Sequence, residues 1–122
     1  MPERKKILLI DDTPAVLHIL ISMLSDEYDI VIAINGETGL GLVKKIVPDA
    51  VIVDLLMPDI SGYDVLKALK ADDATKQIPV ILISGTGSEQ TEQESCSLGA
   101  AAFIVKPFDA GVLKQKISGA LR

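Results

Sequence analysis

The sequence predicts one α/β domain over residues 1–122, built on an open parallel β-sheet with helices on both faces, and two observations predict it. Five short apolar runs alternate with five longer segments that carry helix signals. The runs are rich in Val and Ile and mostly continuous, which is typical of strands buried on both faces of a parallel sheet. Right-handed crossovers between such strands favour a doubly wound (βα)₅ arrangement.

The expected strands and helices alternate without a linker or repeat, which is why we expect a single domain. The strands are Lys6–Ile10, Tyr28–Ile34, Ala50–Val53, Val80–Ile83 and Ala102–Val105. The helices are Pro14–Leu24, Glu37–Val47, Gly62–Lys70, Ser88–Leu98 and Ala110–Leu121.

Local signals support each helix in turn. The first has Thr13 at its N-cap position and Pro14 as its first residue. The second carries Gly39 and Gly41, which cost about 1 kcal/mol each relative to Ala, so packing must stabilise it. The third follows a Pro-Asp turn, the fourth is mostly polar and is expected to end at Gly99, and the fifth has apolar residues at helical spacing.

Composition excludes several classes of function. The net charge of −5 argues against direct nucleic acid binding, which needs clustered Lys and Arg. No stretch approaches the roughly 18 apolar residues of a membrane span, and the apolar run after Arg4–Lys6 is too short for a signal peptide. We therefore expect a cytoplasmic protein without a membrane partner. The single cysteine, Cys96, excludes an internal disulfide and is expected to be a small packing residue.

Polar residues follow four of the expected strands, and ligands of doubly wound sheets bind at these carboxyl ends. They are Asp11-Asp12, Asp54, Ser84-Gly85 and Lys106-Pro107. Taken singly, each has an ordinary explanation as a helix cap, a turn former, a plain turn or a surface lysine. Together they would place three carboxylates at one edge of the sheet, where they repel each other unless a cation neutralises them. Mg²⁺, which prefers oxygen ligands, suits such a site.

Four segments carry a resemblance to a known family. Ile7–Asp12, Val51–Pro58, Ile81–Gly85 and Phe103–Phe108 resemble, in this order and with typical spacings, the receiver domains of two-component response regulators. The resemblance covers nearly the whole chain. It implies a flavodoxin-like fold with strand order 2-1-3-4-5. It also implies that the protein is a phosphorylation switch.

The resemblance implies a role for each residue of the acidic cluster. Asp54 takes the position of the phosphoacceptor, whose carboxylate forms an aspartyl phosphate. Asp12 matches the direct Mg²⁺ ligand, and Asp11 the partner that orients metal-bound water. Asp54 itself and the backbone carbonyl of Leu56 complete the protein ligands, and Mn²⁺ is expected to be able to replace Mg²⁺.

Further positions match residues that contact the phosphoryl group. Lys106 would pair with one phosphoryl oxygen and Ser84 would donate its hydroxyl to another. Gly85 would let its backbone N–H approach the group, because it has no side chain in the way. Pro107 stands where the family usually has a cis peptide bond.

The family also implies how the phosphorylated state is read and how long it lasts. Phe103 matches the switch aromatic that moves together with Ser84, and we favour this role over that of an ordinary core residue. The switch would change the surface formed by the fourth helix, the fifth strand and the fifth helix, and so control a partner or an output domain. Leu56 and Thr86 match the positions that tune hydrolysis; we expect slow dephosphorylation, because Leu56 cannot orient a water molecule.

The expected phosphodonor is a sensor histidine kinase or a histidine phosphotransfer protein, and the downstream effector is unknown. His18, the only histidine, is expected to be a surface residue rather than a donor. By the resemblance, Leu17 and Ile21 fall on the outer face of the first helix, where with Pro107 and Phe108 they could form the kinase-docking patch. Alternatively, the two are scattered exposed apolar residues without a role.

Two other functions compete with the receiver interpretation. The first is an aspartate-nucleophile phosphatase, but such enzymes resemble Asp-x-Asp after the first strand, whereas Asp11 and Asp12 are adjacent. The second is a pseudo-receiver, a binding module that is never phosphorylated and that typically lacks an acid or the lysine. Because this chain keeps all of them, we expect a phosphoacceptor rather than an enzyme, with at most self-phosphorylation and autodephosphorylation activity.

Overall fold

A five-stranded parallel sheet forms the centre of the protein. The computed structural model describes residues 4–85 and 89–121. The strands are β1 (Lys6–Ile10), β2 (Asp29–Ala33), β3 (Ala50–Asp54), β4 (Val80–Ser84) and β5 (Ala102–Val105). They lie in the order β2-β1-β3-β4-β5, which confirms both the predicted fold class and the flavodoxin-like strand order.

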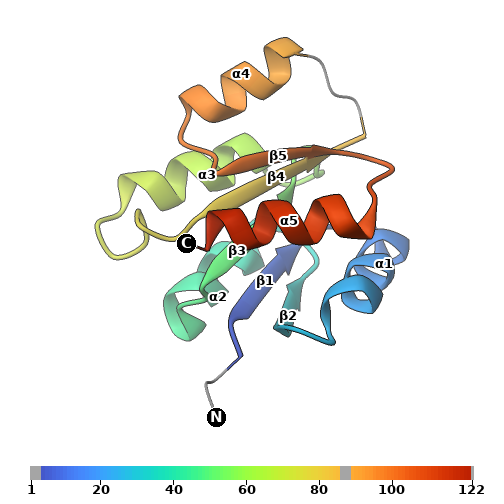
Figure 1. The fold of residues 1–122 in the computed structure, drawn as a ribbon. Coiled ribbons are helices and arrows are strands. Elements are labelled where there is room, and N and C mark those ends of the chain that lie inside the picture. The colour runs from blue at the N-terminus through green and yellow to red at the C-terminus, as the bar shows by residue number, and fades with distance from the viewer. Residues whose placement is uncertain (1–3, 86–88, 122) are drawn as a thin grey trace.

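The helices cover both faces of this sheet (Figure 1). They are α1 (Pro14–Leu24), α2 (Gly36–Ile46), α3 (Gly62–Ala71), α4 (Glu89–Ser97) and α5 (Ala110–Ala120). Helices α1 and α5 pack on one face and α2 and α3 on the other, while α4 lies beside β5. Within the described ranges, no helix combines the length and the apolarity that a membrane crossing requires.

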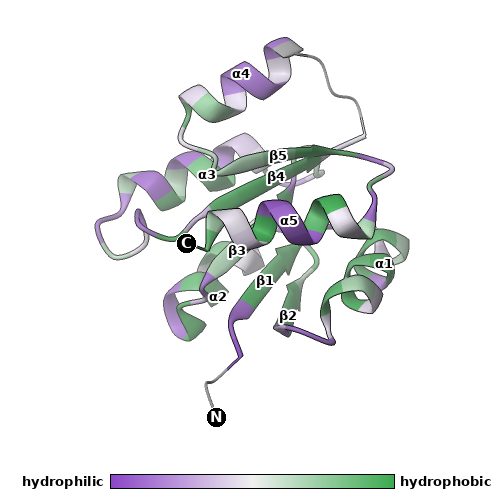
Figure 2. Cartoon of the chain, in the orientation of Figure 1, coloured by the Kyte–Doolittle hydropathy of each residue, from purple (hydrophilic) through white to green (hydrophobic). Residues whose placement is uncertain are grey.

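Alternate residues of the central strands supply two separate hydrophobic cores. In β1, Leu8 and Ile10 face α2 and α3, whereas Ile7 and Leu9 face α1 and α5. All residues of β3 and β4 are buried, as their continuous apolar sequences predict. Figure 2 shows the contrast between this apolar sheet and the mixed colouring of most helices, of which α4 is among the most polar and α1 is largely apolar.

Burial on both faces was wrongly predicted for β2. This strand lies at the edge of the sheet, where Asp29 and Ile32 are exposed and only Ala33 is buried. An edge strand has a neighbour on one side only, so the helices cannot cover it as completely as they cover the central strands.

The predicted signals at the start of α1 and after α4 fall where the helices begin and end. Thr13 occupies the N-cap position of α1, but its side chain makes no capping hydrogen bond. Gly99 follows α4 with a φ of 101°, a conformation that glycine adopts readily. Cys96 is exposed, so its predicted packing role is wrong. Among the residues of α4 whose burial is described (90–97), Ser95 is buried, and its hydroxyl donates to the Thr91 carbonyl at 2.8 Å.

Gly39 and Gly41, two of the three glycines of α2, are predicted to respond oppositely to substitution by alanine. A Cβ on Gly39 would lie 2.4 Å from Cδ1 of the buried Ile10, so Gly39→Ala should destabilise the protein by about 1–3 kcal/mol. Gly41 has no atom within 4 Å of that position, and Gly41→Ala should stabilise the helix by about 0.5–1 kcal/mol. Urea unfolding of both variants measures the difference, and equal effects would contradict this description of the packing.

Candidate functional site

Polar residues gather at the carboxyl end of the sheet because neighbouring strands end at nearly the same level. Ile10 of β1 pairs with Val53 of β3, so Asp11 and Asp54 follow adjacent residues. Lys106 comes directly after β5, and its backbone N–H donates to the Ser84 carbonyl at 2.7 Å. The register thus brings the acids of β1 and β3 to the same edge as the lysine after β5.

Three carboxylates lie together at this edge. One oxygen from each of Asp11, Asp12 and Asp54 falls within 4.8 Å of the other two. Asp11 and Asp54 are buried, with 1% and 6% of their surface exposed, whereas Asp12 is exposed. The Lys106 ammonium lies 3.6 Å from Asp54 Oδ2 and 3.8 Å from Asp11 Oδ2.

One lysine does not neutralise three acids. Burial, followed by the charge of Asp11, raises the pKa of Asp54 above the ordinary value of 3.8, although Lys106 and the Leu56 backbone N–H act in the opposite direction. The Oδ1 atom of Asp11 accepts a hydrogen bond from the Thr13 backbone N–H at 2.8 Å. Its Oδ2 atom is buried and accepts no hydrogen bond within the part of the chain that the structure describes.

The donor set fits a hard divalent cation. An unbonded, buried carboxylate oxygen is costly, and a cation, or a water molecule that the cation holds beside it, would remove that cost. Carboxylate oxygens are the ligands that Mg²⁺ prefers, usually together with water and phosphate oxygens. Because Asp12 is exposed, one side of the cluster is open to such additional ligands.

The loop after β3 contributes its backbone rather than its side chains. The Leu56 backbone N–H lies close enough to the Asp54 carboxylate to lower its pKa, a contribution that the sequence did not suggest. The Leu56 side chain is 66% exposed and therefore points away from the core. Helix α3 begins beyond this loop with a capping box, in which Ser61 and Asp64 bond each other's backbone N–H.

The ends of β4 and β5 supply the remaining predicted residues. Ser84 is fully buried at the end of β4. A Cβ on Gly85 would meet no atom within 4 Å, so the space beside this residue is open. The Lys106–Pro107 peptide bond is cis, as the resemblance implied. Thr86 lies outside the described residues.

Phe103 is a buried residue of β5, opposite Leu82 of β4. It belongs to the core that faces α2 and α3, as an ordinary packing residue would. Its backbone carbonyl accepts a hydrogen bond from Lys116 Nζ at 2.8 Å. Its role as a switch therefore stays a prediction.

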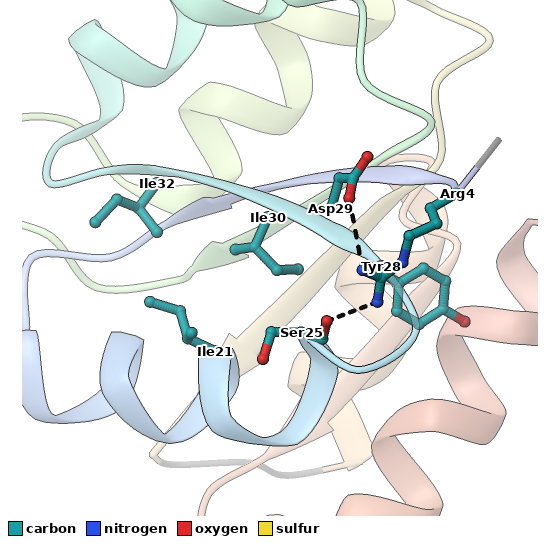
Figure 3. Close-up of a pocket in the computed structure, with 7 residues that line it drawn as sticks. All are labelled: Arg4, Ile21, Ser25, Tyr28, Asp29, Ile30 and Ile32. Atoms are coloured by element: carbon teal, nitrogen blue, oxygen red, sulfur yellow. Dashed lines mark hydrogen bonds and ion pairs between the residues drawn. The ribbon is translucent and has the colours of Figure 1, made fainter.

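The predicted patch on α1 is wrong for Leu17, which is buried, and Ile21 lies away from Pro107 and Phe108. Leu17 is 4% exposed and, with Leu20 and Leu24, forms the buried face of the helix. Ile21 lines a groove next to the β2 edge, together with Ile30, Ile32 and the Arg4–Asp29 ion pair (Figure 3). His18 is exposed, as expected.

A different set of α1 residues lies beside the acidic cluster. Their side chains and the loop after β5 enclose an apolar groove of about 440 Å³. Its lining residues are Val16, Ile19, Met23, Gly85, Lys106, Pro107 and Phe108. The sequence alone did not reveal this groove, because nearly all residues of α1 are apolar and the buried face does not stand out.

Comparison with known proteins identifies close resemblance over the whole chain. The family model described as "Response regulator receiver domain" matches residues 7–118. The chain is 31% identical over 118 residues to the DNA-binding dual master transcriptional regulator RpaA of Synechocystis and 34% identical over 121 residues to the probable transcriptional regulator ycf27 of Porphyridium aerugineum. These matches cover 96% and 98% of this chain but 49% of each relative, so the chain spans about half of their length.

Solved structures agree with this result. The chemotaxis protein CheY4 of Vibrio cholerae superposes with a TM-score of 0.90 at 26% identity, covering 97% of this chain and 99% of CheY4. A response regulator receiver domain protein from Clostridium thermocellum gives a TM-score of 0.88 at 30% identity, covering 96% of this chain and 94% of that protein.

Removing the Asp54 charge should stabilise the metal-free protein in a pH-dependent way. Because the pKa of Asp54 is raised on folding, the folded state holds this proton more tightly, and ionisation above about pH 3.8 costs folding free energy. Asp54→Asn should therefore raise the melting temperature at pH 7 in EDTA, and the gain should disappear at pH 3. Asp73→Asn, which changes an almost fully exposed carboxylate, is the control. An equal gain in melting temperature at pH 7 and pH 3 would contradict a raised pKa for Asp54.

Proposed function

Because the chain belongs to the family of response regulator receiver domains, we propose that it is a signalling switch that accepts a phosphoryl group on Asp54 in a Mg²⁺-dependent reaction. The phosphoacceptor role is general for the family. The observation that carries the assignment to Asp54 is its position, buried at the end of a central strand between two carboxylates and a lysine. The phosphoryl group would come from a histidine kinase or a histidine phosphotransfer protein.

In the reaction, an Asp54 carboxylate oxygen would bond to phosphorus while the bond between phosphorus and the donor histidine nitrogen breaks. Asp12 and Asp54, with the Leu56 carbonyl, would hold the Mg²⁺, and Asp11 would orient its water. When bound, the ion supplies positive charge for the phosphoryl oxygens. Asp12 is exposed and therefore accessible to the ion, whereas Asp11 is buried. This difference supports direct coordination by Asp12 and an orienting role for Asp11.

Three residues would hold the transferred group. The Lys106 ammonium lies 3.6 Å from Asp54 Oδ2. After phosphorylation it would form an ion pair with a phosphoryl oxygen in place of the free carboxylate. Ser84 would donate its hydroxyl to another oxygen. The open space beside Gly85 would admit the group to the backbone N–H. All three lie at the ends of β4 and β5, so phosphorylation would form new contacts with these two strands.

The signal would leave through the α4-β5-α5 surface. Phe103 lies in β5, next to the strand that ends in Ser84, and a movement of that hydroxyl would change its packing. A groove of about 360 Å³ connects the three elements and contains Phe103 together with Glu92 of α4 and Lys116 of α5. A partner or output domain that reads this groove would sense the state of Asp54.

The phosphorylated form is proposed to be long-lived. Hydrolysis needs a water in line with the departing Asp54 oxygen. The exposed Leu56 side chain has no group to orient that water and could shield the phosphorus from solvent. Thr86 is the second proposed tuning position.

Phosphorylation should occur on Asp54 alone. Acetyl phosphate and Mg²⁺ should add one phosphoryl group, detected as a mass increase that is removed by hydroxylamine, which cleaves acyl phosphates. Asp54→Asn should remain unmodified, because its amide is not a nucleophile of this kind, and EDTA should suppress the reaction in the unchanged protein. Modification of Asp54→Asn at equal yield would refute the assignment.

The apolar groove beside α1 is proposed to dock the histidine-bearing partner. Ile19→Asp places a charge on its 47% exposed residue and should slow phosphotransfer from the protein donor about tenfold or more, since apolar contact is lost. Phosphorylation by acetyl phosphate should be unchanged, because it needs no docking. Ile32→Asp, at 43% exposure on the β2 edge, is the matched control. Equal effects of both variants would contradict docking at this groove.

A further inference from the structure

The loop between β3 and α3 carries Leu56, and its ends are firmly held. At its start, the Leu55 N–H donates to the Ile83 carbonyl at 2.8 Å. At its end, the Gly62 N–H donates to the Leu55 carbonyl at 2.8 Å, which closes the loop at its base. A Cβ on Gly62 would lie 2.7 Å from the Asp54 carbonyl oxygen, so the start of α3 packs directly on the phosphoacceptor backbone.

Asp59, at the tip of this loop, bonds the N-terminus of α2. Its Oδ1 accepts from the Gly36 N–H at 3.3 Å and its Oδ2 accepts from the Glu37 N–H at 3.0 Å. These hydrogen bonds, that of Glu37 first, hold the pKa of the Asp59 carboxyl below its ordinary value. A carboxylate suits this end of a helix, where the backbone N–H groups carry partial positive charge.

The four N–H groups of the first turn of α2 are shared between two side chains and one carbonyl. Asn35 Oδ1 accepts from the Thr38 N–H at 2.8 Å, and the Asn35 carbonyl accepts from the Gly39 N–H at 3.1 Å. The Gly36 and Glu37 N–H groups are those that Asp59 takes. The first turn is therefore completed by a residue that is 22 or 23 positions away in the sequence.

Ile60 strengthens the same junction. A Cβ on Gly36 would lie 2.4 Å from Ile60 Cγ1, so the loop and the first residue of α2 approach closely. Asp64, by contrast, accepts from the Ser61 N–H at 3.2 Å and makes only a local cap within α3. Asp59 and Asp64 are thus two exposed carboxylates in one segment, of which only Asp59 connects the loop to another helix.

We infer that Asp59 is a positioning residue for the phosphorylation site: it pins the loop to α2, so that the Leu56 N–H stays near the Asp54 carboxylate and the Leu56 carbonyl, the proposed Mg²⁺ ligand, keeps its place in the loop. The loop is fixed at its base by Gly62 and at its tip by Asp59, with Leu56 between them. The part of the inference that concerns Mg²⁺ rests on the proposed function. The part that concerns the Leu56 N–H does not.

Amide hydrogen exchange in metal-free protein, followed by NMR, tests the pin directly. Asp59→Ala should accelerate exchange of the Leu56 N–H severalfold, because the loop then opens more often. Asp64→Ala removes a carboxylate from the same segment. The Leu56 N–H of this variant should exchange at nearly the rate of the unchanged protein, even if the variant loses as much melting temperature as Asp59→Ala. Asp59→Asn keeps one acceptor oxygen and should restore part of the protection.

A Mg²⁺ titration by calorimetry gives the second readout. The dissociation constant should rise about tenfold in Asp59→Ala, as for other residues that support a metal ligand, and remain nearly constant in Asp64→Ala. Equal Leu56 exchange and equal Mg²⁺ affinity in these two variants would overturn the inference and show that Asp59 is a helix cap only. Should Asp54 of the unchanged protein fail to accept a phosphoryl group, the proposed function falls, while the exchange comparison still decides the role of Asp59.

Discussion

The structure depends on holding like charges together at the carboxyl end of its sheet. Asp11 and Asp54 are buried there beside the exposed Asp12, and Lys106 is the ammonium within ion-pair distance of the two buried acids. Such a cluster is unfavourable in isolation. It is maintained because the strands that carry it are fixed by two hydrophobic cores, and their parallel register leaves the acids no room to separate. The packing of the fold thus offsets the repulsion between the acids, and a bound cation or phosphoryl group would reduce that repulsion.

The backbone around the acids is as important as the acids themselves. The Leu56 N–H lowers the pKa of Asp54, the Gly62 N–H closes the loop on the Leu55 carbonyl, and Asp59 ties the tip of the loop to α2. Of these contacts, those of Asp59 join residues that are 22 and 23 positions apart in the sequence. The geometry of the site is therefore a property of the α2, β3 and α3 junction and not only of the strand ends.

Much of this could be predicted from the sequence, because buried parallel strands leave continuous apolar runs and their last residues identify the sheet edge. Other features had no such signal. Helix α1 is apolar apart from the exposed His18 and Ser22, so the sequence does not show that Leu17 is buried and Ile19 exposed. The exposure of Cys96 depends on how α4 meets β5, and the edge position of β2 depends on its neighbours. Nothing local connects Asp59 to Gly36, since that contact exists only in the folded chain.

The two edges of the sheet differ in a way that matters for self-association. At the β5 edge, the Phe103 carbonyl is already bonded to Lys116, and a charged side chain of this kind discourages the addition of a foreign strand. At the β2 edge, Ile30 and Ile32 lie along a strand that pairs, among the described strands, with β1 alone. Partial unfolding of the neighbouring α1 would enlarge this apolar edge into a template for strand addition, so aggregation of a destabilised variant would begin at β2 rather than at β5.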